Sequence, residues 1–201
     1  MQTTTQPKEQ FTARPLFGGA MTCVVPTRFV DVSDIRPVPD NQEVFTDVHT
    51  DQSLIIEILE YQSAVSDTDS ASYLFNDLAE ANEATDGARI VHQEAMSPED
   101  MPNFPDVPKS VLLGVQRIAK FNESNRAKNV VQVYLANVRL PRHTTDLLIT
   151  LNEPVQVAQE SSSKVNVDTL DAATRERMDS TLLIFKAVLK SLRVNDWTLF
   201  G

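Results

Sequence analysis

Hydrophobic and polar residues alternate along three neighbouring segments in the second half of the chain, residues 111–121, 130–140 and 145–151. Alternation with a period of two is typical of β-strands that bury one face. Polar breaks separate the three segments, and short connections between consecutive strands favour an antiparallel meander. The same reasoning predicts further strands at residues 16–25, 44–48 and 88–96.

Other segments carry the spacing of amphipathic helices. In residues 52–65 one helical face would hold apolar side chains, and Thr50 or Asp51 could cap the N-terminus. Residues 70–83 predict a second helix. A third is expected from about residue 169 to residue 193, with Asp168 or Asp171 favouring its N-terminal end. Helices of this kind bury their apolar stripe against a sheet, so the sequence predicts an α+β fold, an antiparallel β-sheet covered by α-helices.

The remaining segments read as connections. Residues 1–14 are predicted to be a disordered N-terminal tail, because Phe11 is their one apolar residue able to anchor them. Prolines and serines predict surface loops at residues 97–108 and 159–164. The chain has 201 residues, so residues 15–201 fit a single domain.

Composition excludes several classes of function. The net charge of -10 argues against DNA or RNA as a partner, because phosphate binding needs a surface of lysine and arginine. The same charge disfavours an anionic membrane surface, and no apolar run approaches the ~20 residues of a membrane span. Cys23 is the single cysteine, so an internal disulfide is impossible. We therefore expect an acidic intracellular protein that binds neither nucleic acid nor membrane.

Catalytic and metal-binding motifs are absent from the sequence. His49, His92 and His143 lie far apart, and none has the spacing of a metal-ligand pair. Cys23 has no histidine-containing motif beside it and is expected to pack in a strand. Residues 67–78 could begin like a calcium loop but have serine where that loop needs glycine. We expect no catalytic residue, no metal and no cofactor.

One enzymatic alternative stays open at this point. A cleft could be assembled from distant residues, for example His92 with Glu94, or His143 with Asp146. A histidine with a strongly perturbed pKa inside a deep pocket would be the first support for that alternative.

The segment with the clearest sign of binding is acidic. Four carboxylates lie between residues 31 and 43, where Arg36 is the one residue of opposite charge; they are Asp31, Asp34, Asp40 and Glu43. Three prolines (Pro26, Pro37 and Pro39) restrict the surrounding backbone, and a pre-ordered loop loses less entropy on binding. From composition alone, this segment is either a solvated connection or a negative surface for a basic partner.

Several stretches resemble a known family. They are LFGGA at residues 16–20, DVSDIRPVPDNQEVF at 31–45, TDQSLIIEILE at 50–60, QRIAKFNE at 116–123, TDLLITLNEP at 145–154 and SLRVNDWTLFG at 191–201. Together they resemble the Ran guanine-nucleotide release factors, the Mog family of Ran-binding proteins. The resemblance implies a PsbP-like α+β fold and a non-catalytic protein that binds the small GTPase Ran and promotes release of its guanine nucleotide.

The resemblance also implies which residues would contact Ran. In this family the negative surface includes the acidic pair of a VPDxQEV motif, which stands here at residues 38–44 and gives Asp40 and Glu43. Asp34 and Asp31 are candidates by proximity. A monomer supporting nuclear protein import, found in the nucleus and cytoplasm and mainly nuclear, is the corresponding expectation. The alternative is an acidic scaffold for another basic protein.

Overall fold

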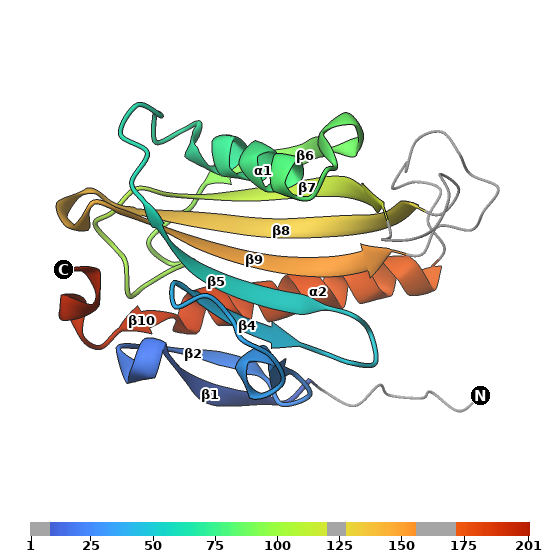
Figure 1. The fold of residues 1–201 in the computed structure, drawn as a ribbon, viewed down its shortest axis with the longest axis horizontal. Helices are drawn as coiled ribbons and strands as arrows, with labels where there is room; N and C mark the ends of the chain where they lie inside the picture. Colours follow the sequence, from blue (N-terminus) through green and yellow to red (C-terminus); the bar gives the residue numbers. More distant parts are fainter. Residues whose placement is uncertain (1–8, 120–127, 156–171) are drawn as a thin grey trace.

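The computed structural model describes residues 9–119, 128–155 and 172–201 (Figure 1). Its largest element is a seven-stranded sheet with the order β3-β4-β5-β9-β8-β7-β6. These strands are β3 Val30–Asp31, β4 Gln42–Thr46, β5 Ser53–Glu60, β6 Arg89–Ala95, β7 Lys109–Ala119, β8 Lys128–Leu140 and β9 Thr145–Val155. Each neighbouring pair is antiparallel. The predicted antiparallel meander is therefore confirmed in β7, β8 and β9.

A smaller antiparallel sheet has the order β1-β2-β10, from β1 Phe11–Leu16, β2 Met21–Pro26 and β10 Arg193–Val194. β10 directly follows α2 (Ala172–Ser191), so the end of the chain returns to pair with its beginning. α2 lies between this small sheet and the large one, as Figure 1 shows.

The two faces of the large sheet pack against different helices. On β8, Tyr134, Ala136 and Val138 join the main core with α2, whereas Val133 and Leu135 join a second core under α1 (Ser70–Ala81). This alternation is the direct result of the two-residue period of a strand. The predicted α+β fold, with helices covering an antiparallel sheet, is confirmed.

Close packing of α1 depends on one glycine of β7. A Cβ placed on Gly114 would lie 2.4 Å from Cε2 of Phe75. Because real carbon atoms do not approach so closely, Gly114 is what allows the Phe75 ring to pack directly against the strand. Gly114 thereby fixes the distance between α1 and the sheet.

The predicted helix at residues 52–65 is wrong. Residues 53–60 form β5, which pairs with β4 on one side and β9 on the other. Leu54 and Ile56 are fully buried in the main core, while Leu59 packs on the α1 side. A run of apolar residues in SLIIEILE satisfies helical and strand spacing equally, and its β-branched isoleucines favour the central strand.

Two boundaries also differ from the sequence-based expectation. Residues 11–14 of the predicted tail belong to β1, whose partner strand β2 satisfies their backbone. The predicted strand 16–25 is interrupted by a 3-10 turn, η1 Phe17–Gly19. The predicted helix 70–83 and strand 88–96 are confirmed in α1 and β6 within a few residues. The predicted loop 159–164, the caps Asp168 and Asp171, and residues 1–8 of the tail lie outside the described residues.

Candidate functional site

The acidic segment, residues 31–43, lies at one edge of the large sheet. β3 is the edge strand, and the chain then runs through a 3-10 turn, η2 Val32–Asp34, and a proline-containing stretch before it enters β4. Val32 is buried beneath η2, whereas residues 33–37 are exposed. The edge position places the polar side chains of this segment on the surface.

The first two acidic candidates occupy η2 and its cap. The Asp31 carboxylate accepts hydrogen bonds from the backbone N–H and the hydroxyl of Ser33, at 2.8 Å and 2.7 Å. It therefore caps the turn, a role that engages one of its oxygens. Asp34 lies within η2 and is exposed, and the neighbouring Ile35 has 69% of its surface exposed.

Asp40 lies at the tip of a turn that is held by its backbone. The N–H of Gln42 donates to the carbonyl of Pro39 at 2.9 Å, and Asn41 exchanges hydrogen bonds with the backbone of Ile58. The Asp40 side chain is exposed. A carboxylate on a turn tied to β5 has a fixed position without being used by the fold, which suits recognition of a partner.

Glu43 is a structural residue as well as an acidic one. It stands in β4 opposite Ile56, and its carboxylate accepts a hydrogen bond from the backbone N–H of Phe17. Partial burial, and to a smaller extent the charge of Asp31, raise the pKa of Glu43 above its ordinary value, although the Phe17 hydrogen bond acts in the opposite direction. Glu43 thus joins the large sheet to η1 of the small one.

The turn that Glu43 holds has an uncommon backbone. Phe17, Gly18 and Gly19 all have positive φ, at 49°, 65° and 93°. The side-chain amide of Asn195 donates to the carbonyl of Gly19 at 3.0 Å, which ties the same turn to the C-terminal segment. Neither contact has a local signature in the sequence, since both join residues that are remote along the chain.

The C-terminal turn η6 (Trp197–Phe200) carries an aromatic cluster. Trp197 stacks on His143 with ring centroids 5.0 Å apart, and Phe200 contacts both rings. His143 comes from η4 (Pro141–His143), the turn between β8 and β9. Figure 1 shows η1, this β8–β9 turn and the C-terminus at the same end of the molecule.

The two residue pairs considered for catalysis have different surroundings in the structure. Asp146 is buried and bound to the guanidinium of Arg139, with Arg139 Nε 3.1 Å from Oδ1, while His143 stacks on Trp197. His92 and Glu94 do meet, with Nε2 3.5 Å from Oε2, but both side chains are about 60% exposed on β6. Cys23 is buried, and burial raises the pKa of its thiol to about 12, which disfavours the thiolate that a nucleophilic cysteine needs.

Metal binding finds no support in the described residues. No group of three or more histidine, cysteine, aspartate or glutamate side chains is arranged there to hold an ion. Asp67, from the rejected calcium loop, instead pairs with Arg139 at 2.9 Å. Neither described helix has the length and apolar run needed to cross a membrane.

Comparison with known proteins places these features in a family. The family described as Ran-interacting Mog1 protein matches residues 14–154. The chain belongs to the Mog1 family. Among relatives, the Ran guanine nucleotide release factor of Danio rerio is 44% identical over 193 residues, covering 94% of this chain and 100% of that protein. The nuclear import protein mog1 of Schizosaccharomyces pombe is 30% identical over 92% of this chain and 98% of its own length.

Solved structures support the same fold. The Saccharomyces cerevisiae Ran-binding protein Mog1p has a TM-score of 0.75 and 24% identity, covering 96% of this chain and 100% of that one. Cyanobacterial PsbP from Synechocystis has a TM-score of 0.50 and 15% identity, covering 96% and 98%. The predicted Mog family membership and PsbP-like fold are confirmed. In this Mog1 family member, the VPDNQEV motif presents Asp40 outward and Glu43 toward η1.

Proposed function

We propose that this chain binds the small GTPase Ran and promotes release of its guanine nucleotide, in support of nuclear protein import. The observation that carries the proposal is similarity over nearly the whole chain to proteins named Ran guanine nucleotide release factor, at 44% and 39% identity. Two yeast relatives are named nuclear import protein, which supports a role in transport and a location in the nucleus and cytoplasm, mainly the nucleus.

The acidic segment is the surface proposed to contact Ran. Asp40 is its central residue, because its carboxylate is exposed on a turn that the backbone holds in place. Asp34 lies exposed on η2, and Asp31 caps that turn. Glu43 contributes partly by negative charge and partly by holding η1. A negative surface of this kind would attract basic side chains and speed association.

Nucleotide release by this protein would require binding energy and no bond-making chemistry. A nucleotide bound with nanomolar affinity has about 12 kcal/mol of binding free energy. If the protein binds nucleotide-free Ran more tightly than loaded Ran, reciprocity weakens the nucleotide by the same factor. The acidic surface could do this by engaging basic residues of Ran that otherwise hold phosphates, or by disfavouring the Mg²⁺-bound switch conformation. We accordingly propose a non-catalytic protein without a cofactor, monomeric when unbound.

The second candidate is an acidic scaffold for a different basic protein. It is favoured by the net charge of -10, which is not specific for one partner. Binding measured against purified Ran and against a second small GTPase separates the two. Preference for nucleotide-free Ran, weakened at least tenfold by Asp40→Lys, supports the release factor. Equal binding to both GTPases supports the scaffold.

A further inference from the structure

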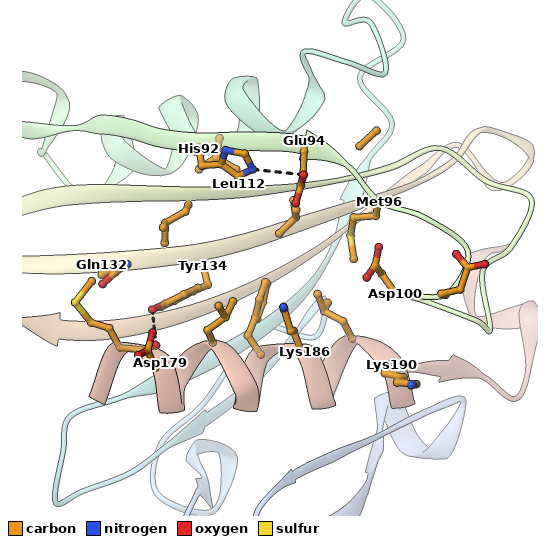
Figure 2. A pocket seen from close by; sticks show the side chains of 18 residues that line it. His92, Glu94, Met96, Asp100, Leu112, Gln132, Tyr134, Asp179, Lys186 and Lys190 are labelled. Carbon is orange, nitrogen blue, oxygen red and sulfur yellow. Dashed lines mark hydrogen bonds and ion pairs between the residues drawn. The ribbon is translucent and has the colours of Figure 1, made fainter. Parts of the chain in front are cut away.

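A groove lies on the opposite half of the large sheet from the acidic segment. Figure 2 shows it between α2 and the strands β6, β7 and β8, and its cavity volume is 590 Å³. This volume falls within the range of about 300–1,000 Å³ that is usual for small-molecule sites. The strand order places β3 and β4 at one edge of the sheet and β6 at the other, so the groove is separate from the proposed Ran-binding surface.

The groove exists because α2 covers only part of this face of the sheet. The helix packs against β2 and β9, leaving the β6 and β7 side of the face uncovered by a helix (Figure 1). The exposed strip is largely apolar, and its walls include Val111, Leu113, Tyr134, Leu182, Phe185 and Leu189. An apolar molecule would gain free energy by displacing water from these walls.

One polar side chain that lines the groove has an atom without a hydrogen-bond partner. Gln132 stands on β8 in the same row as Tyr134 and Ala136, is 4% exposed, and lines the groove. Its Oε1 is buried and accepts no hydrogen bond from any described residue. The nearby Tyr134 hydroxyl is already used, since it donates to the Met178 carbonyl at 2.9 Å. A buried amide oxygen without a donor is costly, so a ligand that supplies one would be favoured once the Gln132 amide turns toward the groove.

The charged side chains that line the groove are exposed and have both signs. Glu94 and Asp100 lie along one side, and Lys186 and Lys190 come from α2 on the other. Burial would disfavour a charge on the part of a ligand that enters the apolar interior. The ligand body that suits this groove is therefore neutral.

We propose that the groove binds a neutral small molecule with an aromatic or branched aliphatic body and one N–H or O–H group that donates to Gln132 Oε1. The apolar walls of the groove favour an apolar ligand body, and Gln132 Oε1 favours a ligand with one hydrogen-bond donor and fixes its orientation. Binding there is independent of the Ran-binding role, because the two surfaces lie at opposite edges of the sheet.

A matched pair of fluorescent probes tests this proposal on the full chain. N-phenyl-1-naphthylamine is neutral and apolar and has one N–H donor, whereas 1-phenylnaphthalene has a similar body without the donor. Titration by fluorescence is expected to give saturable 1:1 binding of the amine, with roughly threefold to tenfold weaker binding of the hydrocarbon. The variant Gln132→Met should reduce binding of the amine by the same factor and leave the hydrocarbon unchanged.

Two adjacent leucines of α2 supply the control for location. Leu182 lines the groove and is 37% exposed, whereas Leu183 is 67% exposed and does not line it. Leu182→Glu should weaken the amine by more than about tenfold, because it places a carboxylate in the apolar wall, and Leu183→Glu should have no effect. The proposal is overturned by absence of saturable binding, by binding that survives Leu182→Glu, or by equal affinity of the two probes.

Discussion

Replacement of Glu43 separates the structural role of the acidic segment from its proposed binding role. In Glu43→Ala the backbone N–H of Phe17 loses its acceptor in a partly buried position. An unsatisfied group of this kind costs about 1–3 kcal/mol. Since 1 kcal/mol shifts the Tm of a domain of this size by roughly 2–4 °C, the expected decrease in Tm is about 2–12 °C.

Glu43→Gln should behave in the opposite way. The glutamine keeps an oxygen for Phe17 and removes a charge that burial and Asp31 disfavour. Because the folded-state pKa is raised above 4.5, ionisation of Glu43 lowers stability as pH rises through that pKa. The variant is therefore expected to be at least as stable as the wild type at pH 7, with the difference disappearing below about pH 4.5.

Urea unfolding followed by circular dichroism measures these free energies, and Asp40→Ala is the matched control. Asp40 is exposed on its turn, so this variant should change stability by no more than about 0.5 kcal/mol. If Glu43→Ala is as stable as the wild type while Glu43→Gln is less stable, the Glu43 side chain does not stabilise η1 by accepting the hydrogen bond from Phe17.

The other predictions concern the core, pH, chemistry and salt. Arg139→Met should cost about 3–5 kcal/mol in urea unfolding because it leaves the buried Asp146 carboxylate without its oppositely charged partner. The added change Asp146→Leu should recover part of that loss. Burial opposes ionisation of Asp47, but hydrogen bonds from His49 and Thr50 and the charge of Arg28 hold its pKa below 3.8. The variant Asp47→Asn should therefore be less stable than the wild type at neutral pH. This difference in stability should fade as the pH falls through the lowered pKa. Cys23→Ser and His143→Gln should retain nucleotide release from Ran within a few-fold, and chromatography should find the released nucleotide unhydrolysed. Loss of release in a folded variant would indicate that the replaced side chain takes part in a catalytic step. Association with Ran in stopped flow should slow markedly between about 0.01 M and 0.1 M salt, where the Debye length falls from about 30 Å to about 10 Å, and an unchanged rate would exclude charge steering.

The elements that could be predicted from sequence are those whose hydrophobic pattern fits only one type of secondary structure. The long alternating strands β7, β8 and β9 are separated by short polar breaks, so their type and pairing both follow from local sequence. β5 could not be assigned in this way, because the spacing of Leu54, Ile55, Ile58 and Leu59 also fits a helix. Pairing with β4 on one side and β9 on the other makes this segment a strand, and these partners are distant contacts that the local sequence does not show.

The candidate site was predictable in part for the same reason. The proline-punctuated acidic segment is visible in the sequence, and so is the exposure of Asp40 in a polar turn. The contact of Glu43 with Phe17 joins residues 26 positions apart, one in β4 of the large sheet and the other in η1, the turn between β1 and β2. The unpartnered amide oxygen of Gln132 likewise depends on which strip of the sheet α2 leaves uncovered. Neither has a local signature.

The most direct test of the central claim is the rate at which Ran releases a fluorescent guanine nucleotide. The wild-type chain should accelerate release in proportion to its concentration. Asp40→Lys should lose at least tenfold of that acceleration while unfolding in urea like the wild type, because reversal of one charge in a desolvated pair costs about 2–5 kcal/mol. A release rate that the wild-type chain does not change, or that Asp40→Lys accelerates equally, would contradict the account.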